Sequence, residues 1–222
     1  MSTMLKNSLT VEQVRNMFLY VAEKIIESKP LLTKIDSAIG DGDHGIGMSV
    51  GFSKAVENLS AKEFSTVNEV FKTIGMSMIN SMGGASGIIF GSMFVGGVKG
   101  LEDRETLDIT LLSKLFSQSL DAIKKRGKAE LGDKTMVDSL QPAVEAMKES
   151  LENDNDRPDF LEVIKKAEDA ALTGVEATKN YVAKFGRSKS LGERALGHQD
   201  AGATSVWLIL KSMREWIEKE GK

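Results

Sequence analysis

Three aspartates stand within eight residues at the start of a glycine-rich stretch. Asp36 is followed by the segment IGDGDHGIGM, residues 39–48, which contains Asp41 and Asp43. Two carboxylates about 4 Å apart repel each other by about 4 kcal/mol at an effective dielectric constant near 20. Carboxylate oxygens suit hard cations, and Mg²⁺ commonly joins a few carboxylates to substrate phosphates. The spacing therefore indicates a divalent metal site, with an ordinary solvated Asp/Gly turn as the alternative.

The same stretch fits the pattern G-x-G-x-x-G through Gly40, Gly42 and Gly45. Dinucleotide binding by this pattern requires a preceding strand and a βαβ unit, but the preceding LLTKIDSA is a poor strand in helical surroundings. The P-loop pattern G-x-x-x-x-G-K-[ST] is absent from the sequence. An EF-hand is excluded because its fifth and twelfth positions, counted from Asp41, are Gly45 and Phe52. The three carboxylates remain the informative feature.

Other glycine-rich loops carry groups that suit phosphate. GGASG, residues 83–87, precedes a predicted helix, whose first N–H groups and the Ser86 hydroxyl would favour an anion. The segment 185–205 carries several cations, among them Arg187, and arginine pairs bidentately with phosphate. A tight turn between two helices and a surface lid are the respective alternatives.

Two more observations concern these loops. KKRGKAELGDKTMVD, residues 124–138, mixes cations with glycines and is equally compatible with a solvated loop whose helix is capped at Asp133 or Thr135. The two histidines of the chain, His44 and His198, both lie in glycine-rich loops beside an aspartate. This shared setting favours a role at the site, although a satisfied loop histidine is the common case.

Apolar residues at steps of three and four predict helices throughout the chain. Thr10 with Gln13, and Thr66 with Glu69, form potential capping boxes before two of them. No strand and no internal repeat is expected. The eight predicted helices span about residues 11–25, 46–59, 67–82, 88–98, 112–123, 136–151, 158–184 and 206–217.

The connections differ in character. Three are long and glycine-rich, at about residues 30–45, 124–135 and 184–202, and GGASG is a shorter one. Long connections in a compact domain are usually functional or disordered. If the helices run up and down, these four loops precede the second, fourth, sixth and eighth helices and lie at one end. The polar segment 152–158 is predicted to be a loop, because similar helices flank it, so residues 1–222 form one domain.

Composition limits the function classes. The 222 residues include no cysteine, which excludes disulfides and thiolate metal sites. A net charge of −3 with mixed signs gives no basic footprint for nucleic acid. No apolar run of membrane-spanning length and no signal peptide is recognised, so a cytoplasmic protein without membrane contact is expected.

Four motifs together resemble one known family. IGDGDHGIGM, GGASG, RGKAELGDKTMVD and YVAKFGRSKSLGERALGHQDAGATS closely resemble the nucleotide-binding L subunits of dihydroxyacetone kinases. The resemblance spans nearly the whole chain, in order and with similar spacing. It implies an all-α fold, an antiparallel up-and-down barrel of eight amphipathic helices with the nucleotide site at one end.

The resemblance also implies a site. Asp36, Asp41 and Asp43 match the aspartates that hold two Mg²⁺ ions against the nucleotide phosphates. Other positions match residues that contact phosphate, adenine and the remaining parts of the nucleotide, and none is expected to act as a covalent nucleophile. These nucleotide-binding positions are His44, Gly45, Ile46, Gly47, Ala85, Ser86, Gly127, Met136, Arg187, Asp200, Ala201 and Gly202.

Two of these positions depart from the family pattern. Gly47 stands where the family often has asparagine, and Ala201 where it has proline. The first change removes a side-chain amide near phosphate, and the second relaxes a turn. Both are expected to loosen nucleotide binding, and neither removes a metal ligand.

As a function, the resemblance implies a phosphotransferase subunit that binds ADP or ATP. It would receive phosphate from a phosphohistidine carrier of the phosphotransferase system and pass it, through ADP, to dihydroxyacetone on a K subunit. Open alternatives are exchange of free ATP, a related ketose such as erythrulose, a homodimer, a regulatory subunit that contacts a transcription factor, and a helical bundle whose loops bind nothing.

Overall fold

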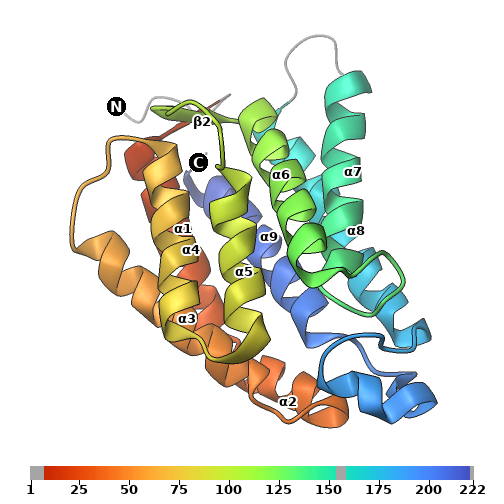
Figure 1. Cartoon of the computed structure of the whole chain (residues 1–222). Helices are drawn as coiled ribbons and strands as arrows, with labels where there is room; N and C mark the ends of the chain where they lie inside the picture. The colour runs from red at the N-terminus through yellow and green to blue at the C-terminus, as the bar shows by residue number, and fades with distance from the viewer. Residues whose placement is uncertain (1–7, 154–158, 221–222) are drawn as a thin grey trace.

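The computed structural model describes residues 8–153 and 159–220, and within these ranges the chain is almost entirely helical (Figure 1). The all-α prediction is confirmed, and each of the eight predicted helices is present as α1 or α3–α9. In chain order the elements are β1 (Ser8–Thr10), α1 (Val11–Glu27), α2 (Lys29–Ile39), α3 (His44–Ser60), α4 (Val67–Ser81), α5 (Gly84–Gly97), β2 (Thr106–Asp108), α6 (Ile109–Gly127), α7 (Val137–Asn153), α8 (Phe160–Ala177), the 3-10 helices η1 (Thr178–Asn180) and η2 (Arg187–Ala195), and α9 (Ala201–Glu220).

Both predicted capping boxes are present. The Gln13 N–H donates to Thr10 Oγ1 at 3.3 Å, and the Thr10 N–H donates to Gln13 Oε1 at 2.9 Å. Thr66 and Glu69 make the same reciprocal pair before α4. Each box satisfies N–H groups that a helix start leaves without an intrahelical partner. The sequence therefore fixes where these two helices begin.

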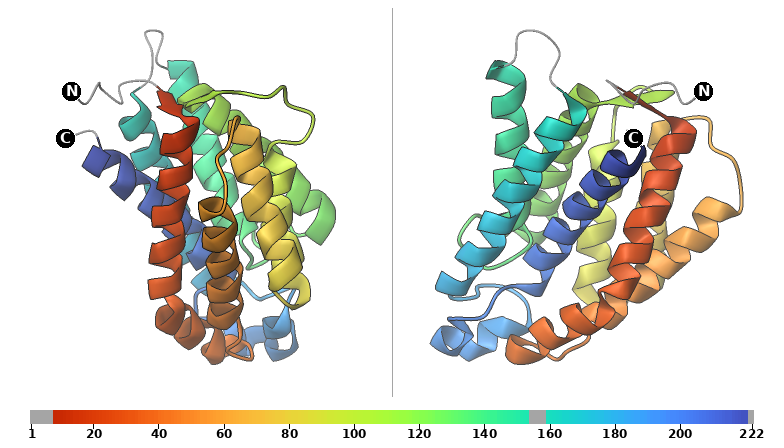
Figure 2. Two further views of the ribbon diagram at one scale, coloured as in Figure 1. Left: turned by 90° about the vertical axis from the view of Figure 1, so that its left-hand side faces the viewer. Right: turned by 180° about the vertical axis from the view of Figure 1, so that it is seen from behind.

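The eight long helices pack in chain order around one apolar core. Each packs against the next, α1 against α3, and α9 returns to α1 (Figures 1 and 2). The rings of Phe18 and Phe71 meet edge to face at 5.0 Å between centroids, and Phe94 lies 5.8 Å from Phe18. Buried apolar surface of this kind supplies the main driving force for folding.

Two predictions about the connections need correction. Residues 30–45 are not one long loop, because Lys29–Ile39 form α2, with Pro30 in the first turn where a missing N–H costs little. The predicted helix 158–184 is too long, since α8 ends at Ala177 and is followed by the short 3-10 helix η1, and Val182 is 40% exposed. Residues 154–158, most of the predicted polar loop, lie outside the described part of the chain.

The prediction that no strand is present is also wrong, because the structure contains the short strands β1 and β2, of three residues each. Ser8 pairs with Asp108, and Leu9 with Leu107, in an antiparallel ladder. Leu9 and Leu107 are both buried, so the pair closes the apolar core at this end. The ladder and the last turn of α9 lie away from α2 and η2 (Figures 1 and 2).

The predicted grouping of the loops is borne out. Successive long helices run in opposite directions, so the connections before α3, α5, α7 and α9 gather at the lower end in Figure 1. This end also holds α2 and η2. Among the described residues, no helix combines the length and the apolar character that crossing a membrane would require.

Helices α4 and α5 cross at two glycines. A Cβ added to Gly75 would lie 2.6 Å from Val95 Cγ2 and 2.7 Å from the carbonyl oxygen of Gly91. A Cβ added to Gly91 would lie 2.8 Å from the carbonyl oxygen of Gly75, so neither glycine leaves room for a methyl group. The close approach of the α4 and α5 backbones therefore depends on the absence of a side chain at residue 75.

We expect Gly75→Ala to lower the free energy of unfolding by about 1 kcal/mol. Overpacking costs about 1–3 kcal/mol, while alanine's better helix propensity returns about 1 kcal/mol. Urea unfolding measures the difference. Gly83→Ala is the control, because φ there is −79° and a Cβ would meet nothing within 4 Å in the described chain. A Gly75→Ala protein at least as stable as wild type would contradict the close crossing.

Candidate functional site

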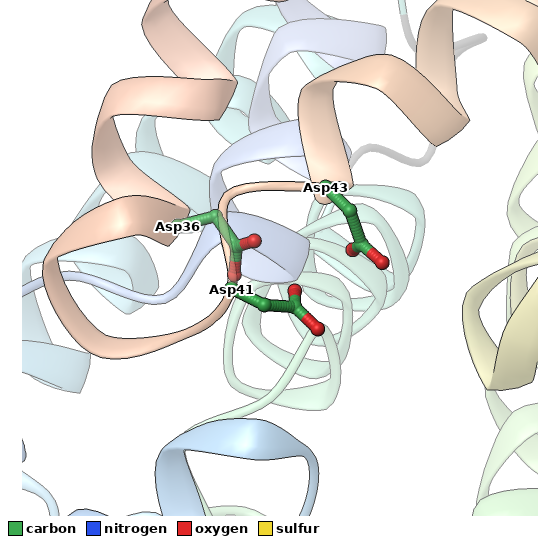
Figure 3. Close-up of side chains that lie close together, drawn as sticks. All are labelled: Asp36, Asp41 and Asp43. Atoms are coloured by element: carbon green, nitrogen blue, oxygen red, sulfur yellow. The ribbon is translucent and has the colours of Figure 1, made fainter.

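The three predicted acidic residues come together. Asp36 lies in the last turn of α2, and Asp41 and Asp43 lie in the turn that leads into α3 (Figure 3). One carboxylate oxygen from each residue lies within 4.8 Å of the others. Gly42 makes the tight turn possible with a φ of +77°, a conformation that favours glycine. The donor set, three carboxylates in a small space, fits Mg²⁺.

The electrostatics of this cluster favour a cation. Burial raises the pKa of Asp43, and the neighbouring charges of Asp41 and Asp36 raise it further. Arg187, at the start of η2, opposes this shift. Its Nε lies 2.8 Å from Asp41 Oδ2, although its side chain is 78% exposed. The structure therefore joins a predicted phosphate contact to a predicted metal ligand, across 146 positions of the sequence.

His44 lies inside the molecule. Its Nε2 is 2.8 Å from Ser205 Oγ in α9, and its ring centroid is 5.9 Å from that of Phe90. Burial lowers the pKa of the imidazole, and the charge of Asp36 acts in the opposite direction. Its backbone N–H donates to Asp36 Oδ2 at 3.3 Å. The side chain thus ties α3 to α9, and the backbone is what faces the acidic cluster.

The next three predicted residues form the first turn of α3. Gly45 packs on α2, where an added Cβ would lie 2.5 Å from the carbonyl oxygen of Lys29. Ile46 is 49% exposed. At Gly47 an added Cβ would meet only Met82 Cε, at 3.7 Å, so the position has room for a Cβ. The N-terminus of α3 carries a partial positive charge beside the acidic cluster, which suits a phosphate held there.

Ala85 and Ser86 lie in the first turn of α5. Gly83 precedes this helix without a side-chain hydrogen bond to its N–H groups, and Gly84 has a φ of +69°. Uncapped N–H groups at a helix start can bind an anion. The turn lies at the same end of the molecule as the acidic cluster (Figure 1). The structure places this segment as expected, while its contact with phosphate stays a prediction.

The predicted adenine-pocket residues lie on α6 and before α7. Gly127 ends α6, where a Cβ would lie 3.3 Å from Ile89 Cδ1 of α5. Met136 is buried just before α7. A Cβ on Gly202 would lie 3.5 Å from both the Cβ and the backbone nitrogen of Met136. Met136 and Gly202, predicted as separate contacts, are therefore neighbours.

The start of α9 completes this end. Asp200 Oδ2 accepts a hydrogen bond from the Ala203 N–H at 2.7 Å, and the Asp200 N–H donates to Thr178 Oγ1 at 2.9 Å. Burial raises the pKa of Asp200 to about 7, while the Ala203 N–H lowers it. Ala201 is buried in a regular first turn, so proline is not needed to shape it.

Sequence reasoning missed a residue that shapes the site. Asp138 accepts hydrogen bonds from the N–H groups of Gly132, at 2.5 Å, and Thr135, at 2.7 Å. It thereby folds the loop before α7, a role that the sequence suggested for Asp133 or Thr135. The signal was present, because an aspartate in the first helical turn can accept from preceding N–H groups. No sequence pattern indicates Ser205 as the hydrogen-bond partner of His44, because the two residues are 161 positions apart.

Comparison with known proteins gives related sequences over most of the chain. Residues 38–215 match the DAK2 domain family. The chain is 37% identical to the ADP-binding subunit DhaL of the PEP-dependent dihydroxyacetone kinase of Escherichia coli K12, across 93% of this chain and 97% of that one. It is 41% identical to the ADP-binding subunit DhaL of PEP-dependent dihydroxyacetone kinase 1 of Listeria innocua, across 86% and 89%.

A solved structure shares the fold. The dihydroxyacetone kinase of C. freundii, crystallised in complex with AMP-PNP and Mg²⁺, matches with a TM-score of 0.68 and 24% identity. The match covers 91% of this chain and 33% of the C. freundii chain. This chain thus spans about a third of that longer protein, and the likeness concerns the fold.

We expect Mg²⁺ to stabilise the wild-type protein through the acidic cluster. A ligand at a hundredfold its dissociation constant adds about 2.7 kcal/mol to the free energy of unfolding. Thermal unfolding with and without Mg²⁺ measures this gain, which Asp41→Asn and Asp43→Asn should remove. Asp169→Asn, an exposed carboxylate on α8, serves as the control and should keep it. Equal gains in all four proteins would place the cation elsewhere.

Asp200 should make stability depend on pH. Its pKa is about 7 in the folded protein against an ordinary value of 3.8, so between these values the folded state holds a proton that the unfolded state releases. The contribution of this group to stability therefore falls as pH rises from about 4 to 7. Asp200→Asn keeps an acceptor for the Ala203 N–H but does not titrate, so it should gain stability relative to wild type across that range. Parallel pH profiles of urea unfolding would contradict the shifted pKa.

Proposed function

The chain belongs to the DAK2 domain family, and we propose that it is the nucleotide-binding subunit of a dihydroxyacetone kinase. The cluster of Asp36, Asp41 and Asp43, with Arg187 beside it, is the observation that carries this proposal. Relatives named as ADP-binding subunits align over nearly their whole length. ADP or ATP with two Mg²⁺ ions is the proposed ligand set.

The chain's own groups suit phosphoryl transfer, which depends mainly on positioning and charge neutralisation. Bound Mg²⁺ would supply neutralisation of phosphate oxygens. Asp36, Asp41 and Asp43 would hold the metal, and Arg187 would turn from Asp41 toward a phosphate, since its exposed side chain is free to reorient. The first turns of α3 and α5 would hold further phosphate oxygens through backbone N–H groups.

No side chain is assigned a covalent step. His44 is buried, and its Nε2 is engaged by Ser205, so it is not placed to accept a phosphoryl group. The proposed reaction moves phosphate from a phosphohistidine carrier to a ketose on a partner K subunit, with ADP as the intermediate acceptor. The relatives named as PEP-dependent kinase subunits support this scheme over free exchange of ATP.

The nucleotide released from denatured, purified protein tests the choice between these cycles. Retained ADP would support the carrier-fed cycle. Freely exchanging ATP would support ordinary kinase turnover. A purified protein that carries no nucleotide, and that binds neither ADP nor ATP when these are added with Mg²⁺, would contradict both cycles. It would favour a helical bundle without this site.

Asp43→Asn should abolish phosphoryl transfer to the ketose while leaving the fold intact. The loss of one carboxylate removes a ligand of the proposed metal. Removal of a single group that stabilises transition-state charge lowers kcat by about 10²- to 10³-fold in other enzymes, and we expect a loss at least as large here. Transfer from carrier to ketose is measured with the K subunit present, and circular dichroism checks the fold. Asp169→Asn is again the control. Transfer at the wild-type rate by Asp43→Asn would refute the role of the cluster.

A further inference from the structure

Lys134 is a buried lysine in the loop between α6 and α7. It is 1% exposed and has a φ of +60°, a backbone conformation uncommon for residues other than glycine. Lysine is almost never fully buried unless its ammonium group is paired. A strained backbone that carries a buried charge persists only where the surroundings hold it in place. Such a position points to a specific task.

The ammonium group of Lys134 joins two other segments. Its Nζ donates to the carbonyl oxygen of Thr178 at 2.6 Å and also to the carbonyl oxygen of His198. Burial lowers the pKa of this lysine from its ordinary value, while the charges of Asp200 and Asp138 act in the opposite direction. Three segments far apart in sequence, namely the α6–α7 loop, the end of α8 and the loop before α9, therefore meet at one cation.

These segments carry the proposed nucleoside contacts. Met136 lies two residues after Lys134 and next to Gly202. Asp200 lies two residues after His198, and its N–H donates to the hydroxyl of Thr178. The acidic cluster, by contrast, is built by the turn between α2 and α3, which has its own hydrogen bond from the His44 N–H to Asp36. The turn that builds the acidic cluster is thus held by a hydrogen bond that does not involve Lys134.

We propose that Lys134 is a positioning residue that holds the nucleoside side of the nucleotide site in shape. The inference rests on the proposed function. Without the ammonium group, the carbonyl oxygens of Thr178 and His198 lose this donor, and the loops that carry Met136 and Asp200 are free to separate. The metal and phosphate side would keep its geometry. Lys134 therefore governs how well the base and ribose are bound, and leaves polyphosphate binding unchanged.

Calorimetric titration with two probes tests this separation. We expect Lys134→Met to weaken Mg²⁺–ADP binding by about tenfold or more, since hydrogen bonds to charged groups contribute about 1.5–3 kcal/mol. Its affinity for Mg²⁺–pyrophosphate, which lacks base and ribose, should equal that of wild type. Lys179→Met is the matched control. Lys179 follows Thr178 in the sequence, but its Nζ pairs with the exposed Glu176 and not with either loop. The control should bind both probes as wild type does.

Thr178→Val gives a second route to the same answer. It removes the hydroxyl that accepts from the Asp200 N–H and is close to threonine in shape. The selective loss of ADP affinity should recur, because valine keeps the Thr178 carbonyl oxygen that Lys134 contacts but removes the link from this junction to Asp200. The role of the junction therefore stays testable if Lys134→Met does not fold. Wild-type ADP affinity in a folded Lys134→Met protein would overturn the inference, as would equal weakening of both probes. Failure of the wild-type protein to bind either probe would instead refute the proposed function.

Discussion

The mutual repulsion of Asp36, Asp41 and Asp43 is the constraint on which this end of the molecule depends. The carboxylates lie within 4.8 Å of one another because a short turn, residues 40–43, joins α2 to α3, and because Gly45 lets α3 pack closely on α2. Arg187 and the N-terminus of α3 offset part of the repulsion. The protein thus spends folding free energy to hold like charges together, an arrangement typical of functional sites.

A second feature is the central place of the α9 N-terminus. Ser205 reaches His44 of α3, Gly202 lies against Met136 before α7, and Asp200 is held by Thr178 at the end of α8. These contacts connect the acidic cluster to the α6–α7 loop through one helix. A shift of α9 along its axis would therefore move both halves of the site together, whereas a change in the α6–α7 loop would affect one half.

Local signals made most of the fold predictable. Apolar stripes and capping boxes predict eight of the helices. An up-and-down order of these helices then predicts that four of the loops lie at one end. Helix α2 escapes the sequence analysis because only Leu32 and Ile39 are buried along it, and because Pro30, which lies in its first turn, is also typical of the residues that follow a helix end. Strands of three residues carry too little periodicity to detect.

At the site, the spacing of the sequence predicts the three aspartates, which are close in sequence. The pairs His44–Ser205 and Lys134–Thr178 join residues 161 and 44 positions apart, and no local pattern specifies them.

The β1–β2 ladder and the last turn of α9 lie at the end opposite the acidic cluster (Figure 2). Both ends of the described chain therefore point away from the site. A second domain joined at either end would be attached at the end away from the glycine-rich loops, so this helical unit can be part of a larger polypeptide without changes to its loops. In the C. freundii enzyme, the matching fold occupies about a third of a longer chain.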